Sequence, residues 1–415
     1  MDFEIPLSGI MEVTMKRIRI GTRGSKLALR QAEMVREAIE RKHSEIETEI
    51  VVLHTQGDKI LDKPLVEIGD KGVFVSEFEQ ALLAGEIDLA VHSAKDLPER
   101  LAEGLCIAAV LPRGDVRDVL VVPKGGRVPR AIGDSMEAEK NEGEAEEGQR
   151  TFVIGTGSRR RRRQAGQFWA DVTCKDIRGN VDTRLQKLKN SGGNRTEHGG
   201  ADGSGTNDKA GDIEPGNVYV TGYDGLILAK AGLDRLEIML RYGNAFDFYP
   251  LAPEQFLPAA CQGIIAVEAV QDSEIAALCR EVTDADTERS FLVEREVLTQ
   301  LAADCSDTAA AWCRQEQGSL ILDVMYAGNR HQVKYSEDDQ EQSTDVVSGT
   351  VQFQKVQEAE AGGRTEAQFY KTAEKTGEEV RIRQDRETGK RDALLQAGLA
   401  MAAEAAGLLK GKKIT

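Results

Sequence analysis

Short apolar runs alternate with amphipathic stretches along the first third of the chain. The run Ile18–Ile20 precedes a stretch in which Ala28, Ala32, Val35 and Ile39 recur at helical spacing. Strand–helix alternation of this kind predicts an α/β sheet with parallel strands. The next predicted elements are a strand over 49–54, a helix over 76–83 and a buried strand over 87–91.

The same alternation resumes near Val119, where a second α/β unit is predicted to start. Its elements are a strand over 152–154, a basic helix from Ser158, a helix over 181–189 and a buried strand over 226–228. A strand over 263–267 then precedes two helices, of which the last ends near Ala302. Beyond Cys305 the pattern predicts two strands, an irregular region and a final helix over 393–409.

Three polar segments have the composition of insertions into this framework. Met136–Gly148 is rich in Glu, Ser191–Gly216 is rich in Gly, Asn and Asp, and His331–Thr365 is polar with scattered acids. None has enough apolar side chains to offset the conformational entropy that is lost on ordering. We therefore expect surface loops or disorder in all three.

Length, charge and cysteine content narrow the class of protein. A chain of 415 residues is too long for one core, so two or three domains are expected. The net charge of −16 argues against a nucleic-acid binder, although the insertions supply much of the acidic excess. No apolar run approaches the roughly 20 residues that cross a bilayer, and no signal peptide is recognisable, so we expect a cytoplasmic protein. The six cysteines form no CxxC pair, which argues against disulfides and against a metal site.

Arginines gather where predicted helices begin. The run Arg159–Arg163 follows a Gly-rich turn, an arrangement that presents backbone N–H groups and the positive end of a helix dipole to an anion. From this run alone, an anion site and a solvated basic face or polyanion-binding stripe are equally favoured. Arg178 and Arg184 flank the start of another helix, and Arg23 lies in the first strand-to-helix turn. Together they predict a polycarboxylate held in an interdomain cleft.

Lys95 and Asp96 directly follow the buried strand over 87–91. The carboxyl end of a strand is where open α/β sheets place their ligand sites. A lysine beside an aspartate offers a cation and a carboxylate that can transfer protons. The alternative is a capped turn with an exposed ion pair, which is the better interpretation of an arbitrary Lys-Asp dipeptide.

Eight ordered motifs run through most of the chain. They are IGTRGSKLAL (20–29), HTQGD (54–58), DKGVFVSEFEQALL (70–83), DLAVHSAKDLP (88–98), IGTGSRRRRRQ (154–164), IRGNVDTRLQKL (177–188), LAKAGLDRL (228–236) and LPAACQGIIAVE (257–268). In this order and spacing they resemble the porphobilinogen deaminase, or hydroxymethylbilane synthase, family from about Arg17 to about Gln315.

The resemblance implies an α/β fold with two periplasmic-binding-protein-like lobes plus a smaller α/β C-terminal domain. Domain 1 would comprise residues 15–115 plus 263–283, domain 2 residues 116–260 and domain 3 residues 285–415. The family carries a dipyrromethane cofactor, joined by a thioether to a cysteine of the third domain. Four molecules of porphobilinogen are added with loss of ammonia, and hydrolysis releases hydroxymethylbilane for tetrapyrrole biosynthesis. The implied enzyme is a monomeric transferase with a small-molecule substrate and no nucleic-acid or membrane partner.

The resemblance also assigns roles to individual residues. Asp96 matches the catalytic aspartate, which stabilises positive charge on pyrrole nitrogens and assists proton transfers. The arginines that match binders of acetate and propionate side chains are Arg23, Arg160, Arg161, Arg178 and Arg184. Further matched contacts are Ser25, Lys95, Thr156, Ser158, Gln262 and Gly263, while Lys71 and Phe74 match a mobile loop over the cleft.

Cys305 aligns with the cofactor-bearing cysteine, in a loop that departs from the family pattern. The family usually has Gly-Gly before this cysteine and a proline after it, whereas this chain has Ala302-Ala303-Asp304 before it. Loss of the glycines restricts φ, and a neighbouring Asp304 is expected to raise the pKa of the thiol. Cys313 or Cys261 could substitute as the attachment point.

Three other interpretations remain open on the sequence alone. A non-catalytic two-lobed binding protein would keep the arginines but would have no use for Asp96 or a third-domain thiol. A regulatory nucleic-acid binder would use the five arginines, against the overall acidity of the chain. A degenerate family member would be damaged at the Cys305 loop.

Overall fold

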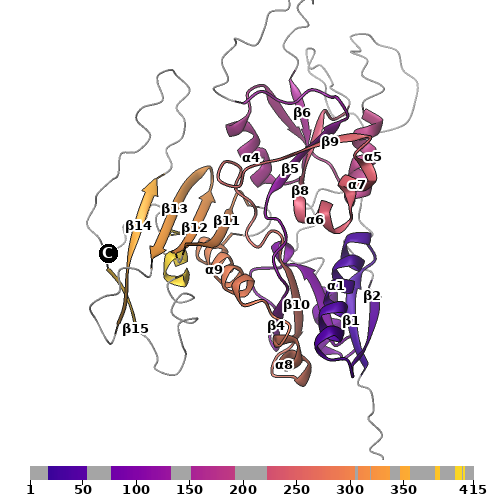
Figure 1. Cartoon of the computed structure of the whole chain (residues 1–415), viewed down its shortest axis with the longest axis vertical. Helices are drawn as coiled ribbons and strands as arrows, with labels where there is room; N and C mark the ends of the chain where they lie inside the picture. The colour runs from indigo at the N-terminus through magenta and orange to yellow at the C-terminus, as the bar shows by residue number, and fades with distance from the viewer. Residues whose placement is uncertain are drawn as a thin grey trace, which may run out of the picture.

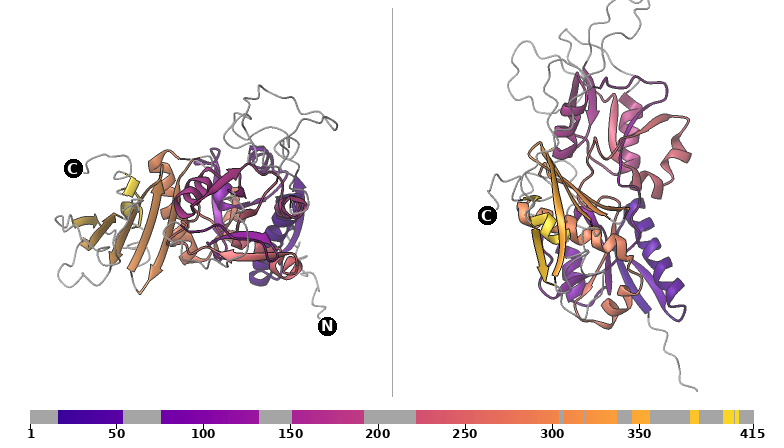
Figure 2. Two further views of the ribbon diagram at one scale, coloured as in Figure 1. Left: turned by 90° about the horizontal axis from the view of Figure 1, so that it is seen from above. Right: turned by 60° about the vertical axis from the view of Figure 1, so that its left-hand side comes forward.

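The computed structural model describes residues 17–53, 76–131, 151–191, 222–303, 307–317, 319–336, 346–355, 379–383, 398–403 and 405–406. Within these residues the strands form three five-stranded sheets (Figure 1). Two of the sheets belong to two lobes that lie end to end, and the third sheet lies to one side of them (Figure 2).

The first lobe is built on a sheet with the strand order β2-β1-β3-β10-β4. Its strands are β1 (Arg17–Arg23), β2 (Glu47–Leu53), β3 (Leu89–Ser93), β4 (Leu105–Val110) and β10 (Ile265–Val270), and its helices are α1 (Lys26–Lys42), α3 (Ser76–Leu83) and α8 (Glu274–Arg280). β1 is parallel to β2 and β3, whereas β10 is antiparallel to β3 and β4. The predicted apolar stripe of α1 packs on β1 in one buried cluster, so helical periodicity places this helix on the sheet.

The second lobe repeats this arrangement with the strand order β7-β6-β8-β5-β9. Its strands are β5 (Asp118–Pro123), β6 (Phe152–Gly155), β7 (Val172–Lys175), β8 (Gly225–Ala229) and β9 (Phe246–Pro250), and its helices are α4 (Arg159–Phe168), α5 (Val181–Ser191), α6 (Lys230–Arg235) and α7 (Ile238–Tyr242). β6 is parallel to β7 and β8, and β5 is antiparallel to β8 and β9.

Two crossovers join the lobes. The chain leaves the first lobe after β4, passes through residues 111–117 and becomes the antiparallel strand β5 of the second lobe. It returns through residues 251–264 and becomes the antiparallel strand β10 of the first lobe. This double crossing between matched sheets is the arrangement expected of periplasmic-binding-protein-like lobes, and the predicted fold class is confirmed.

The third sheet is antiparallel and follows the chain order from β11 to β15. Its strands are β11 (Ala310–Glu316), β12 (Ser319–Tyr326), β13 (Asn329–Ser336), β14 (Val346–Lys355) and β15 (Glu379–Arg383). Helix α9 (Ala285–Leu301) and the C-terminal helical residues 398–406 pack with β11, β12 and β13 in one buried cluster. The predicted final helix is therefore confirmed where the structure describes it.

The prediction that His331–Thr365 is a loop is wrong for much of that segment. Residues 331–336 belong to β13, and residues 346–355 form β14, which pairs with β13. Val333 is buried, while His331 and Gln332, which point to opposite faces of β13, are partly exposed. The backbone ladder holds this strand between two neighbours, and such pairing does not require an apolar side chain at every position.

One buried carboxylate joins both crossovers to the third domain. Glu294, on α9, is fully buried and accepts hydrogen bonds from two nitrogens of the Arg113 guanidinium at 2.6 and 3.1 Å. It also accepts from the backbone N–H groups of Cys261 at 2.5 Å and Cys313 at 2.7 Å. Arg113 lies in the first crossover, Cys261 in the second and Cys313 in β11, so a single side chain fixes their relative positions.

Replacement of Glu294 with alanine is expected to destabilise the whole fold. It leaves the Arg113 guanidinium buried without its charge partner, and breaking such a pair costs about 3–5 kcal/mol of the free energy of unfolding. Urea denaturation followed by circular dichroism measures the change. Glu296→Ala is the control, because Glu296 lies on the same helix and its side chain contacts only Gln300 among the described hydrogen bonds. Similar denaturation midpoints for the two variants would contradict this account of Glu294.

Candidate active site

Lys95 and Asp96 lie at the carboxyl end of β3, in the short 3-10 helix Ala94–Asp96. Asp96 is exposed and Lys95 is half-buried. Desolvation lowers the pKa of Lys95, and the nearby Arg161 and Arg160 of the second lobe lower it further, against the effect of Asp96 and Asp118. The turn predicted from the first lobe therefore faces charged groups of the second.

Arg184, on α5, brings the second lobe into electrostatic contact with Asp96. Its guanidinium donates to the carbonyl of Gly179 at 2.7 Å through Nε. Burial lowers its pKa to about 10, Arg161 and Arg178 act in the same direction, and Asp96 opposes them. Arg184 is thus close enough to feel the charges of three other residues that the sequence predicted to share a cleft: Asp96, Arg161 and Arg178.

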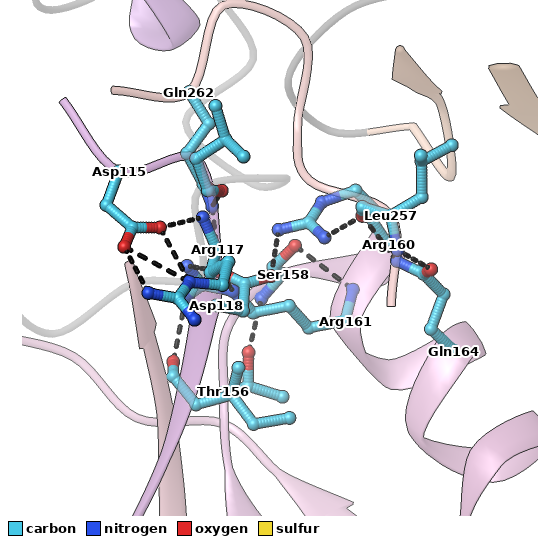
Figure 3. A network of polar contacts seen from close by, with 12 residues as sticks. Asp115, Arg117, Asp118, Thr156, Ser158, Arg160, Arg161, Gln164, Leu257 and Gln262 are labelled. Carbon is cyan, nitrogen blue, oxygen red and sulfur yellow. Dashed lines mark hydrogen bonds and ion pairs between the residues drawn. The ribbon is translucent and has the colours of Figure 1, made fainter. Parts of the chain in front are cut away.

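The serines that precede the first helix of each lobe act as helix caps. Ser25 Oγ accepts from the Ala28 N–H at 3.2 Å at the start of α1, and Ser158 Oγ accepts from the Arg161 N–H at 3.3 Å at the start of α4. The Thr156 hydroxyl accepts from the Ser158 N–H at 3.2 Å (Figure 3). These hydroxyls satisfy backbone groups that a helix start leaves unpaired, and they fix where each helix begins.

The five consecutive arginines divide into three groups. Arg160 and Arg161 are buried and meet at Asp118 (Figure 3). Arg162 donates to the carbonyls of Cys174 and Thr156 and pairs with Asp176. Arg159 and Arg163 are exposed. Buried and exposed arginines therefore occur on one helix, because adjacent residues point to different sides of it.

Three further predicted residues are Arg23, which lies in β1, and Gln262 and Gly263, which lie in the second crossover. Arg23 ends β1, and since β1 and β3 are parallel it lies at the same sheet edge as the Lys95–Asp96 turn. Gln262 donates to the Val116 carbonyl at 2.7 Å and to Asp118 at 3.0 Å. Gly263 has φ of +91°, and a Cβ there would lie 2.6 Å from the Gly114 carbonyl oxygen, so only glycine fits between the crossovers. Gln262 and Gly263 thus make contacts that join the crossovers.

Asp118 and Glu294 are the structurally important residues that the sequence did not reveal. Asp118 begins an otherwise apolar strand, and a lone acid in such a run was the available signal. Glu294 looked like any charged residue of an amphipathic helix, and its partners lie far away in the sequence. Neither position carried a recognisable motif.

Three predicted residues, Lys71, Phe74 and Cys305, lie outside the described part of the chain. The two cysteines that could substitute for Cys305 are both fully buried. Burial raises the pKa of Cys261 and Cys313 well above the usual range, and the carboxylate of Glu294 raises both further. Because the thiolate is the reactive form, both thiols are poor attachment points.

The side chains of this region fit a ligand with several carboxylates. Burial lowers the pKa of Lys95 and Arg184, and the like charge of Arg161 lowers both further. Arg also offers the fork of donors that matches a carboxylate. Within the described residues, no three His, Cys, Asp or Glu side chains are grouped so as to hold a metal ion. No helix in that part of the chain is long and apolar enough to cross a membrane.

Sequence comparison with known proteins is informative for this chain, whereas its likeness to solved structures is weak. Among solved structures, the ligand-binding component of an ABC-type import system from Staphylococcus aureus has a TM-score of 0.30 and 10% identity over 68% of this chain and 73% of that one, a likeness too low to bear on the fold. A porphobilinogen deaminase from Lachnospira eligens is 36% identical over 75% of this chain and 89% of its own length. A probable porphobilinogen deaminase from Thermoplasma acidophilum is 36% identical over 75% of this chain and 87% of its own. The family model described as porphobilinogen deaminase, dipyromethane cofactor binding domain, matches residues 18–277, and with it the chain belongs to the porphobilinogen deaminase family.

Proposed function

We propose that the chain is a transferase of the hydroxymethylbilane synthase type, which condenses four porphobilinogen molecules with loss of ammonia and releases hydroxymethylbilane. The observation that carries the proposal is the meeting of Asp96, from the first lobe, with Arg184 and its neighbouring cations from the second. A non-catalytic binding protein would have no use for a carboxylate in the middle of a carboxylate-binding site.

The proposed residues that hold the dipyrromethane cofactor and the growing chain come from both lobes. The arginines and lysine that pair with its acetate and propionate groups are Arg23, Lys95, Arg160, Arg161, Arg178 and Arg184. Ser25, Thr156, Ser158, Gln262 and Gly263 complete the proposed set, and Lys71 and Phe74 belong to the proposed loop over the cleft. When bound through Cys305, the cofactor supplies the pyrrole to which the first substrate is joined.

Asp96 carries the proposed chemical role. Its carboxylate is exposed at the turn after β3, where a substrate can approach it. An anion at this position stabilises positive charge that develops on a pyrrole nitrogen as ammonia leaves, and it can accept and return a proton. The surrounding cations keep a reacting ring in place by its carboxylates, so that the ring presents its nitrogen to Asp96.

The domain boundaries 15–115 plus 263–283, 116–260 and 285–415 are part of the same proposal. The three sheets support it, because each is built from strands within one of these ranges. We further propose that the protein is a cytoplasmic monomer and that it binds no nucleic acid. The acidic composition supports the last of these statements.

Substitution of Asp96 with alanine is expected to remove most turnover while the protein remains folded. A general acid–base group of this kind contributes roughly 10²–10⁴-fold to the rate. The rate is measured as porphobilinogen consumed, and folding is checked by circular dichroism. Glu103→Ala is the matched control, because Glu103 is an exposed acid on the segment that follows. A near-normal rate for Asp96→Ala would remove this residue from the mechanism.

Substitution of Cys305 with serine is expected to give a protein without the cofactor. The hydroxyl of serine cannot form the thioether, so the intact mass should fall to that of the bare chain. Cys313→Ser is the control and should retain the added mass, because the Cys313 thiol is buried. Added mass that persists in Cys305→Ser and disappears in Cys313→Ser would move the attachment to Cys313.

A further inference from the structure

We propose that Asp118 is a positioning residue for the carboxylate-binding site. Its carboxylate holds one edge of the Arg160 and Arg161 guanidinium groups and leaves their other N–H groups for the ligand. This inference rests on the proposed function, since it assigns a role to a residue behind the same site. Neither the sequence motifs nor the family description assigns one to Asp118.

The geometry places both guanidinium groups on one carboxylate. Asp118 is fully buried at the start of β5. Its Oδ2 accepts from Arg160 Nη2 at 2.8 Å, and its Oδ1 accepts from Arg161 Nη2 at 2.8 Å and Nε at 3.2 Å. Figure 3 shows the two arginines reaching this carboxylate from the first turn of α4.

Backbone carbonyls complete the fixed edge of each arginine. Arg160 Nη1 donates to the Leu257 carbonyl at 2.6 Å, and Arg161 Nη1 donates to the Ile227 carbonyl at 2.8 Å. A guanidinium has five N–H donors, so each group keeps donors beyond these contacts. Orientation of the inner donors also orients the remaining ones, because the guanidinium is planar and rigid.

The charges also favour a positioning role. One carboxylate faces two guanidinium groups, so the buried cluster retains positive charge. Burial would raise the pKa of Asp118, but Arg160 and Arg161 outweigh this effect and hold the pKa well below its usual range. Asp118 therefore stays ionised, and the excess charge that acts on Lys95 and Arg184 remains available to a carboxylated ligand.

Gln262 connects this cluster to the crossovers between the lobes. Its side-chain N–H groups donate to Asp118 Oδ1 at 3.0 Å and to the Val116 carbonyl at 2.7 Å. Val116 lies in the first crossover and Gln262 in the second, so Asp118 sets the arginine pair relative to the point where the lobes meet.

The test uses the cofactor-loaded enzyme and the variant Asp118→Asn, which keeps the side-chain shape and removes the charge. We expect KM for porphobilinogen to rise about tenfold or more while kcat changes far less. The reason is that displaced guanidinium groups lose charge-assisted hydrogen bonds that contribute to substrate binding. Asp115→Asn is the control, because Asp115 pairs with Arg117 on the same crossover, outside the site, and should leave KM unchanged. An unchanged KM in Asp118→Asn would overturn the inference.

A double-mutant cycle separates positioning from a general effect on the fold. If Asp118 acts through Arg161, the KM increase caused by Asp118→Asn should largely disappear in an Arg161→Gln background. Two increases that multiply would overturn the inference. Should Asp118→Asn fail to fold, Asp118→Glu replaces it in the same cycle, because it keeps the charge but displaces the carboxylate from both guanidinium groups; an unchanged KM in that variant would likewise overturn the inference.

Calorimetric binding of porphobilinogen to the same variants makes the two proposals distinguishable. An inactive wild-type enzyme would end the proposed function, yet weaker binding by Asp118→Asn than by Asp115→Asn would still support the role of Asp118. Equal binding by both variants, with an active wild-type enzyme, would end the inference and leave the proposed function intact.

Discussion

Charge balance among the cations near the Lys95–Asp96 turn is the constraint on which the candidate site depends. Arg161 lies close enough to Lys95 and to Arg184 to disfavour the charge of both, and burial reduces the screening that water would provide. Such a cluster of cations is stable only when acidic groups of the protein or of a ligand neutralise part of its charge. Asp118 is the built-in acid, and under the proposed function the carboxylates of the ligand would complete the neutralisation.

Asp96, the proposed catalytic residue, lies in a different environment from Asp118. Asp118 is buried and saturated with donors, whereas Asp96 is exposed at the end of a turn. Asp118 pairs with Arg160 and Arg161, whereas Asp96 acts on Arg184 and Lys95 and is exposed to solvent. The difference arises because Asp96 lies in the turn after β3, whereas Asp118 is the first residue of β5.

Much of the fold could be predicted because local patterns determine it. The apolar stripe of α1 and the serine before α4 carry enough information to place a helix and its first residue. The ordered motifs placed Asp96 and Arg23 on one lobe and the other predicted arginines on the second. The polar strands β13 and β14 escaped prediction, because pairing with neighbours, rather than their own side chains, decides their structure. The contacts of Glu294 escaped for a similar reason, since they join residues that no local pattern relates.

The position of Glu294 has a mechanical consequence. It contacts both crossovers and lies about two turns, roughly 10 Å along the axis, before the end of α9 at Leu301. A rotation of one lobe against the other would bend the two crossovers near their hydrogen bonds to this carboxylate. The third domain, to which α9 belongs, is therefore attached where the two lobes connect and not to one lobe alone.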